Sequence, residues 1–199
     1  GVYDSALIYT RKSIELHESS IIKDSMLLAN SYQSLGIINK FLGKYDQALM
    51  YYDQAERIYH KLDEQILIAY LYTNKSNILQ TRQDYTKAEE YLNHAISILN
   101  TDSIRQKKAL ANAYNNLGII YSRKGNYQKA IEFYDESIRL KNNNNYAYST
   151  IGNMAQCYKK LPKVKLADAH YLKAIGMGTE YYGDSNNVNL AVHYLNYAV

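Results

Sequence analysis

Asparagine recurs at intervals of about 40 residues along the chain, at Asn74, Asn116 and Asn153. A carboxamide carries donors and an acceptor on one flat group, so it can pair with both the N–H and the C=O of an extended peptide backbone. The chain uses asparagine heavily throughout, and these side chains are also consistent with polar positions that face only solvent. The regular spacing favours a role in binding a peptide backbone.

Catalytic chemistry has no comparable pattern. The sequence contains no Gly-rich phosphate loop, no Gly-x-Ser-x-Gly and no His-Glu-x-x-His. Its five histidines include no pair at the spacing of metal ligands. The single Cys157 lies in an apolar segment with Met154 and Ala155, where a packed thiol is expected rather than a nucleophile. We therefore expect a protein that is not an enzyme, with no catalytic residue, no metal site and no cofactor.

The charge pattern excludes one class of partner. The 199 residues carry a formal net charge of +4, from 23 Lys and Arg against 19 Asp and Glu. Proteins that bind nucleic acid concentrate basic residues on one face, whereas both signs are interleaved along this chain. We expect a protein or peptide partner and no nucleic acid.

The apolar pattern bears on location. No apolar run approaches the ~18 residues that a membrane span needs. The single cysteine excludes an internal disulfide and favours a reducing compartment. We expect a cytoplasmic protein in which this segment makes no membrane contact. The alternative is an extracytoplasmic sensor domain of a membrane-anchored protein.

Small residues recur with the same period and indicate the elements that would position the asparagines. One set is Ala6, Ala48, Ala88, Ala130 and Ala167. A second set follows seven residues later, at Ser13, Ala55, Ala95, Ser137 and Ala174. Three residues before the first set stand Tyr3, Tyr45, Tyr85, Tyr127 and Val164. These offsets share one face of an α-helix, so each copy predicts a helix that packs closely on a neighbour.

The residues before each of these helices predict a partner helix. Their matching positions read Tyr32, Leu35, Gly36 and Asn39 in the first complete copy. Lys75 replaces the leucine of this pattern in the second copy, which makes that helix the least regular of the set. The turns between partner helices carry Gly43, Gln83, Gly125 and Pro162, as expected for short loops between antiparallel helices.

The stretch 111–140 resembles a tetratricopeptide repeat (TPR), on Leu117, Gly118, Tyr121, Gly125, Tyr127, Ala130, Tyr134 and Ser137. The resemblance implies an all-α, right-handed superhelical solenoid of antiparallel helix pairs. The period near 40 exceeds the usual 34, and the pattern is similar to bacterial arrays. We expect a single array: a second helix at 2–18, repeats at 26–63, 66–101, 103–141 and 145–178, and a first helix at 187–199. The apolar terminal helices suggest a piece of a longer array.

In this family the first helices line a concave groove that holds a segment of a partner. The resemblance therefore implies the groove residues Asn30, Gln33, Lys40, Tyr70, Asn74, Asn77, Asn112, Asn115, Asn116, Arg123, Asn153, Gln156, Lys159 and Lys160. The basic members would favour an acidic segment. The lysine that chaperone-binding members use to hold a terminal carboxylate is replaced by Gln33, Thr73, Asn115 and Gly152, so binding to chaperone tails is not expected.

The resulting prediction is a scaffold module whose concave groove binds an extended or helical segment of another protein. One alternative is the regulatory arm of a larger bacterial signalling protein, since the C-terminal stretch is similar to arrays before caspase-like (CHAT) peptidases. The N-terminal stretch is similar to arrays attached to sensor kinases or transcription regulators. A second alternative is an oligomerisation module that self-associates through its open terminal helices.

Overall fold

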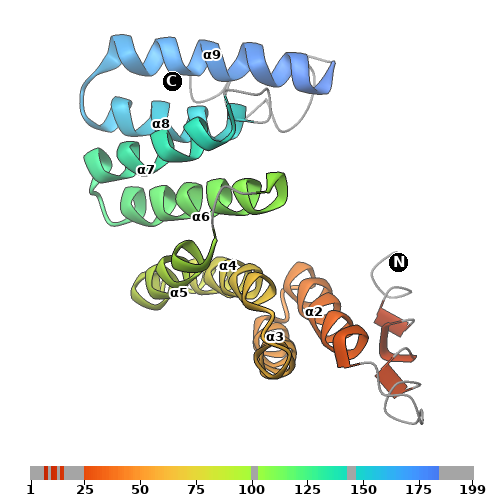
Figure 1. The fold of residues 1–199 in the computed structure, drawn as a ribbon. Helices are drawn as coiled ribbons and strands as arrows, with labels where there is room; N and C mark the ends of the chain where they lie inside the picture. The colour runs from red at the N-terminus through yellow and green to blue at the C-terminus, as the bar shows by residue number, and fades with distance from the viewer. Residues whose placement is uncertain are drawn as a thin grey trace. The chain divides into compact units, whose positions relative to one another are not determined.

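The computed structural model describes residues 7–8, 10–12, 14–15, 25–99, 103–142 and 147–183, and within them every regular element is helical (Figure 1). The chain divides into two compact units, 1–98 and 99–199. The predicted helix at 187–199 lies outside the described residues, and that at 2–18 is described only in part. The helices are α2 (Ser25–Phe41), α3 (Tyr45–Lys61), α4 (Gln65–Thr81), α5 (Tyr85–Ile98), α6 (Ile104–Arg123), α7 (Tyr127–Leu140), α8 (Tyr148–Lys160) and α9 (Val164–Tyr182).

The helices pack as consecutive pairs. In the first unit α2 packs on α3 and α4 on α5, and α3 also contacts α4. In the second unit α6 packs on α7 and α8 on α9, and α7 contacts α8. Gly43 and Gly125 make the turn inside two of these pairs with φ of +71° and +79°, a backbone conformation that costs glycine little. The all-α class and the antiparallel helix pairs expected from the sequence are thus confirmed.

Small residues let the paired helices approach. In the first unit Ala48 and Ala55 of α3 are fully buried, and Tyr52 and Tyr59 from the same face fill the space around Ala29. In the second unit Ala130 and Tyr134 of α7 take the same role against Met154 of α8. Tyrosine therefore supplies part of the buried volume beside leucine, consistent with a large apolar ring that carries one polar atom.

Two glycines are required by this packing. The ring of Tyr52 lies directly on the backbone of Gly36, and the ring of Tyr134 lies on Gly118, so a Cβ atom at either glycine would overlap the ring. The second pair places Ser76 where these glycines stand and Leu92 where the tyrosines stand. A tyrosine on the second helix of a pair therefore occurs together with a glycine on the first helix.

Lys75, the irregular position of the sequence pattern, is only 2% exposed in an uninterrupted α4. Its ammonium pairs with Asp53 at 2.6 Å and with Glu56, both on α3. Burial acts to lower the pKa of Lys75, but the hydrogen bonds to these carboxylates outweigh burial and raise it. The position that interrupts the apolar stripe is therefore a charged link between two helix pairs of the first unit.

Candidate functional site

A pocket of about 300 Å³ in the second unit gathers side chains from two consecutive first helices. Arg123 and Ser122 come from α6, and Asn153, Gln156 and Lys160 come from α8. Asn153, Gln156 and Lys160 follow one another at intervals of three and four residues, so they share one face of α8. Four of the sequence-predicted residues, Arg123, Asn153, Gln156 and Lys160, therefore meet around one space. Ile119, Tyr127 and Tyr134 complete the wall.

The pocket wall is positively charged. Arg123 and Lys160 are exposed, and the residues that line the pocket include no carboxylate. Tyr134 forms the inner wall; burial raises the pKa of its phenol, the nearby Cys157 adds to this, and the charge of Arg123 acts in the opposite direction. The phenol therefore stays neutral at pH 7. The arrangement offers two cations and two amides to a ligand and suits an anionic group.

Cys157 lies behind this wall and is fully buried. Its Sγ lies 3.6 Å from the Oγ of Ser122 and links α8 to α6. Burial raises the pKa of the thiol, and the hydrogen bond with Ser122 acts in the opposite direction. A protonated, enclosed thiol is a poor nucleophile, which agrees with the packed role expected from its apolar neighbours.

Two predicted groove amides of the first unit bind a tyrosine of their own repeat. The hydroxyl oxygen of Tyr59 lies 2.7 Å from Oδ1 of Asn30 and 2.8 Å from Oε1 of Gln33. A hydroxyl donates one hydrogen, so one of the two amides must offer its nitrogen instead. Asn30 and Gln33 are thus held by α3, and part of their hydrogen-bonding capacity is used inside the repeat.

Asn115 belongs to a second internal chain of hydrogen bonds. Its Oδ1 accepts a hydrogen bond from Thr150 at 3.0 Å, and the same Thr150 oxygen accepts one from Lys141 at 2.8 Å. Thr150 is fully buried and Lys141 is only 5% exposed. Burial lowers the pKa of Lys141 to about 8, and the like charge of Lys108 contributes. Asn115 therefore has a structural role at the contact between α6, α7 and α8.

Replacing Lys141 with methionine is expected to raise the free energy of unfolding by about 1–2 kcal/mol at pH 7, because a buried charge is removed. The lowered folded-state pKa means that only the unfolded wild type binds this proton between about pH 8 and 10.5. The free energy of unfolding of the wild type therefore increases as pH rises through this window, and the variant does not show this increase. Urea unfolding at pH 7 and 9.5 measures both effects; exposed Lys165→Met is the control and should show neither.

The other predicted groove residues are spread over both units. Tyr70, Asn74 and Asn77 are half-buried on α4 in the first unit, as is Lys40 at the end of α2. In the second unit Asn112 and Lys159 are exposed and Asn116 is half-buried. Asn116 and Asn153 thus belong to one unit and Asn74 to the other. The asparagine series remains a prediction.

Tyr127 and Tyr134 line the pocket although the sequence pattern assigned them to the core only. Both are on α7, the second helix, and both contribute to packing as well. The signal available in the sequence is the combination of these tyrosines with Arg123, which stands just before the turn into α7. Because both rings occupy packing positions of the repeat, the pattern by itself does not indicate that they also face a pocket.

Within the described ranges, the structure holds no group of three or more His, Cys, Asp or Glu side chains that could bind a metal ion. Among the described helices, none combines the length and the apolar character needed to cross a bilayer.

Sequence comparison identifies relatives for most of the chain. The model of the tetratricopeptide repeat family matches residues 1–61 and 67–143. A TPR repeat-containing protein of Methanocaldococcus jannaschii is 36% identical over 100 residues, which are 49% of this chain and 16% of that protein. The photosystem I assembly protein Ycf3 of Prochlorococcus marinus is 29% identical over 117 residues, or 59% of this chain and 63% of Ycf3. The chain thus spans less than two thirds of either relative.

Solved structures agree on the fold. BtubC from P. vanneervenii superimposes with a TM-score of 0.78 at 21% identity, over 94% of this chain and 77% of BtubC. MamA superimposes with a TM-score of 0.63 at 18% identity, over 92% of each chain. With the family match over more than half of its residues, the chain belongs to the tetratricopeptide repeat family, whose repeats generally mediate interactions between proteins.

Proposed function

We propose that the chain is an interaction module without catalytic activity that binds a segment of a partner protein along α6 and α8, with a carboxylate of that segment in the pocket of Arg123 and Lys160. The observation that carries the proposal is the meeting of two cations and two amides around one pocket of about 300 Å³. Because no lining side chain is acidic, an anion entering the pocket meets no like charge.

The amides would act on the peptide backbone. Asn153 and Gln156 lie in the pocket wall beside the cations. Each carboxamide can donate to a peptide C=O and accept from a peptide N–H, which would orient an extended segment independently of its side chains. Asn116, on the neighbouring first helix, would extend the same contact. Arg123 and Lys160 would then select for an Asp, a Glu or a terminal carboxylate.

The biological setting follows as part of the same proposal. We place the chain in the cytoplasm, with a protein partner and no cofactor. The Prochlorococcus relative is described as an assembly protein. Holding an acidic segment of one subunit while a complex forms would suit a module of this kind, and a longer protein could use the same contact to recruit its substrate.

Selection of peptides from a random displayed library on the full chain tests the proposal. Binders are expected to be enriched in Asp and Glu, and their affinity should fall as salt rises from 50 to 300 mM, roughly the range over which the Debye length drops from about 14 to 6 Å. Binders without acidic residues, or with affinities that salt does not change, would contradict the carboxylate assignment.

A further inference from the structure

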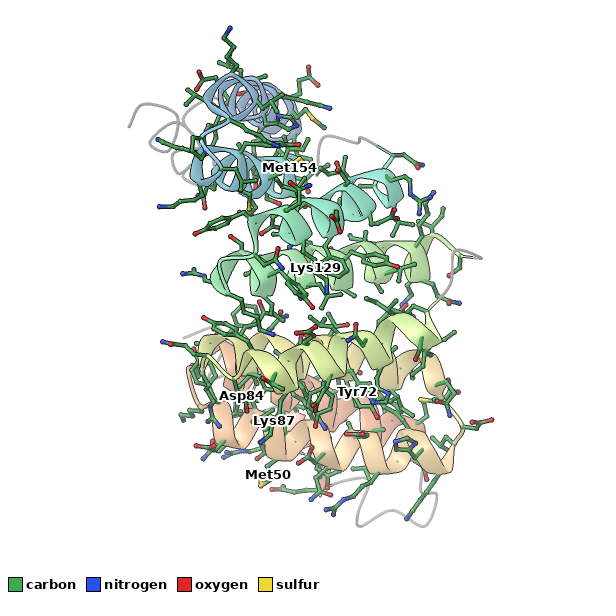
Figure 2. All side chains as sticks on the ribbon, turned by 90° about the vertical axis from the view of Figure 1, so that its left-hand side faces the viewer. Met50, Tyr72, Asp84, Lys87, Lys129 and Met154 are labelled. Carbon is green, nitrogen blue, oxygen red and sulfur yellow. The ribbon has the colours of Figure 1, made fainter. Side chains whose placement is uncertain are left out.

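A second pocket lies in the first unit, on a different set of helices. Its volume is about 460 Å³, and four of its lining residues come from α5, with Glu56 from α3 and Tyr72 from α4. It is therefore built mainly on a second helix, whereas the first helices supply most of the pocket around Arg123. Figure 2 labels two of these lining residues, Tyr72 and Lys87.

Three aromatic rings form one part of the wall. The ring centroids of Tyr72 and Tyr91 lie 5.2 Å apart, and those of Tyr72 and His94 lie 6.0 Å apart in an edge-on arrangement. Ring faces of this kind attract cations within about 6 Å. The protein itself contains one such contact: the ammonium of Lys75 lies 5.4 Å from the centroid of Tyr91.

Two carboxylates, Glu56 and Glu90, complete the wall with Lys87. Lys87 pairs with Asp84 at 3.7 Å, and the two lie together in Figure 2, farther along the helix pair than Tyr72. Lys75, which pairs with Glu56, also pairs with Asp53 at 2.6 Å. The lining residues thus include two carboxylates and one ammonium group, and Glu90 is exposed. The pocket is negatively charged as well as aromatic.

The aromatic pair alone is a packing feature. Equivalent rings meet in the first pair of helices, Tyr32 with Tyr51, and in the third, Tyr114 with Phe133. The combination of these rings with two carboxylates is what distinguishes the second pair. Met50 stands at the position of Glu90 in the first pair. The third pair keeps a carboxylate there, Glu132, but is preceded by Ile96 at the position of Glu56.

We propose that this pocket binds an arginine side chain of a partner protein. The planar guanidinium would lie against Tyr91 and Tyr72 and pair with Glu90, and its apolar stem would cover the rings. Arginine fits better than lysine, because the guanidinium stacks on aromatic faces and forms two parallel hydrogen bonds with one carboxylate. The site is independent of the carboxylate-binding pocket, since all its residues lie in the first unit.

Titration of the full chain with N-acetyl-arginine amide, followed by NMR at the imidazole protons of His94, tests the site. We expect a dissociation constant of about 1–10 mM, typical of so small a ligand. N-acetyl-citrulline amide has the same shape without the charge and should bind at least ~10-fold more weakly. The histidine signal of His170, in the second unit, should not move.

Two matched variants locate the binding. Glu90→Gln is expected to weaken binding of the arginine probe about three- to tenfold. Glu132→Gln, the same change at the equivalent position of α7, should leave it unchanged. Equal binding of citrulline, an unaffected Glu90→Gln variant, or equal binding of N-acetyl-lysine amide would each overturn the assignment. None of these outcomes would alter the test of the pocket around Arg123.

Discussion

Replacing Lys75 with methionine is expected to lower the free energy of unfolding by about 2–3 kcal/mol at pH 7. Removal of one partner from a buried ion pair leaves the other charge uncompensated, which costs more than the pair itself contributes. Here the group that loses its lysine is Glu56, whose side chain is 19% exposed and keeps, among the described residues, only His60 at 3.6 Å as an ion-pair partner. Asp53, by contrast, is 56% exposed and can return to water. Equilibrium urea unfolding followed by circular dichroism measures the loss.

The pH dependence identifies the cause. Burial acts to raise the pKa of Glu56, but the hydrogen bond and charge of Lys75, together with Tyr72 and His60, outweigh burial and lower it. A lowered carboxyl pKa stabilises the protein above the unfolded value, near 4.5, and the contribution is lost as pH falls through the folded value. The Lys75→Met variant lacks the largest of the effects that lower this pKa. The difference between the two proteins should therefore narrow between pH 7 and pH 4.

Two further variants serve as controls. The double variant Lys75→Met with Glu56→Gln should recover most of the lost free energy of unfolding, because the carboxylate that would lack its lysine is then replaced by a neutral amide. Arg82 and Asp46 make a 2.7 Å ion pair with side chains 37% and 90% exposed. Arg82→Met should change stability by less than about 0.5 kcal/mol, as is usual for exposed pairs. An equal loss from Arg82→Met, or no narrowing at pH 4, would contradict the role given to Lys75.

Replacing Gly118 with alanine is expected to lower the free energy of unfolding by about 2–3 kcal/mol, although alanine favours helix over glycine by about 1 kcal/mol. The new methyl group would overlap the ring of Tyr134, which is itself 2% exposed and cannot swing into solvent. Gly176 is also inside a helix, α9, but a Cβ there has no neighbour within 4 Å. Gly176→Ala should therefore leave stability unchanged or raise it by up to about 1 kcal/mol.

The second helix pair supplies a rescue for Gly118→Ala. Ser76 and Leu92 stand where Gly118 and Tyr134 stand in the third pair, and both are fully buried. Adding Tyr134→Leu to Gly118→Ala should therefore cost less than the two single changes combined, as expected for residues in contact. Thermal unfolding of the four proteins measures the coupling. Strict additivity would show that the overlap is not the cause.

The class of fold could be predicted from the sequence because its packing rule is simple. Small residues at Ala48 and Ala55 must lie on a close helix contact, and the helical period alone places them there. Lys75 stood out as irregular because it replaces the leucine of the repeat pattern. Its ion pairs could not be predicted, since its two carboxylate partners lie on a different helix and the period of α4 carries no information about them.

The candidate site could be predicted only in part. Arg123 and Lys160 meet because each ends a first helix and the two helices are neighbours in the array, which the repeat itself implies. The bond between Thr150 and Asn115 depends on how two repeats touch, so the sequence pattern does not indicate a structural role for that asparagine. The pocket around Glu90 lies on a second helix, where the repeat pattern predicts only packing.

The most direct test of the proposed function compares the affinity of one selected acidic peptide for three proteins by fluorescence polarisation. Arg123→Ala with Lys160→Ala should weaken binding at least ~10-fold relative to the wild type, because two charge-assisted contacts are lost. Lys163→Ala with Lys165→Ala removes the same charge from exposed positions outside the pocket and should change binding less than about twofold. If both double variants weaken binding equally, the contact is general electrostatic attraction, and the pocket between α6 and α8 is not the binding site.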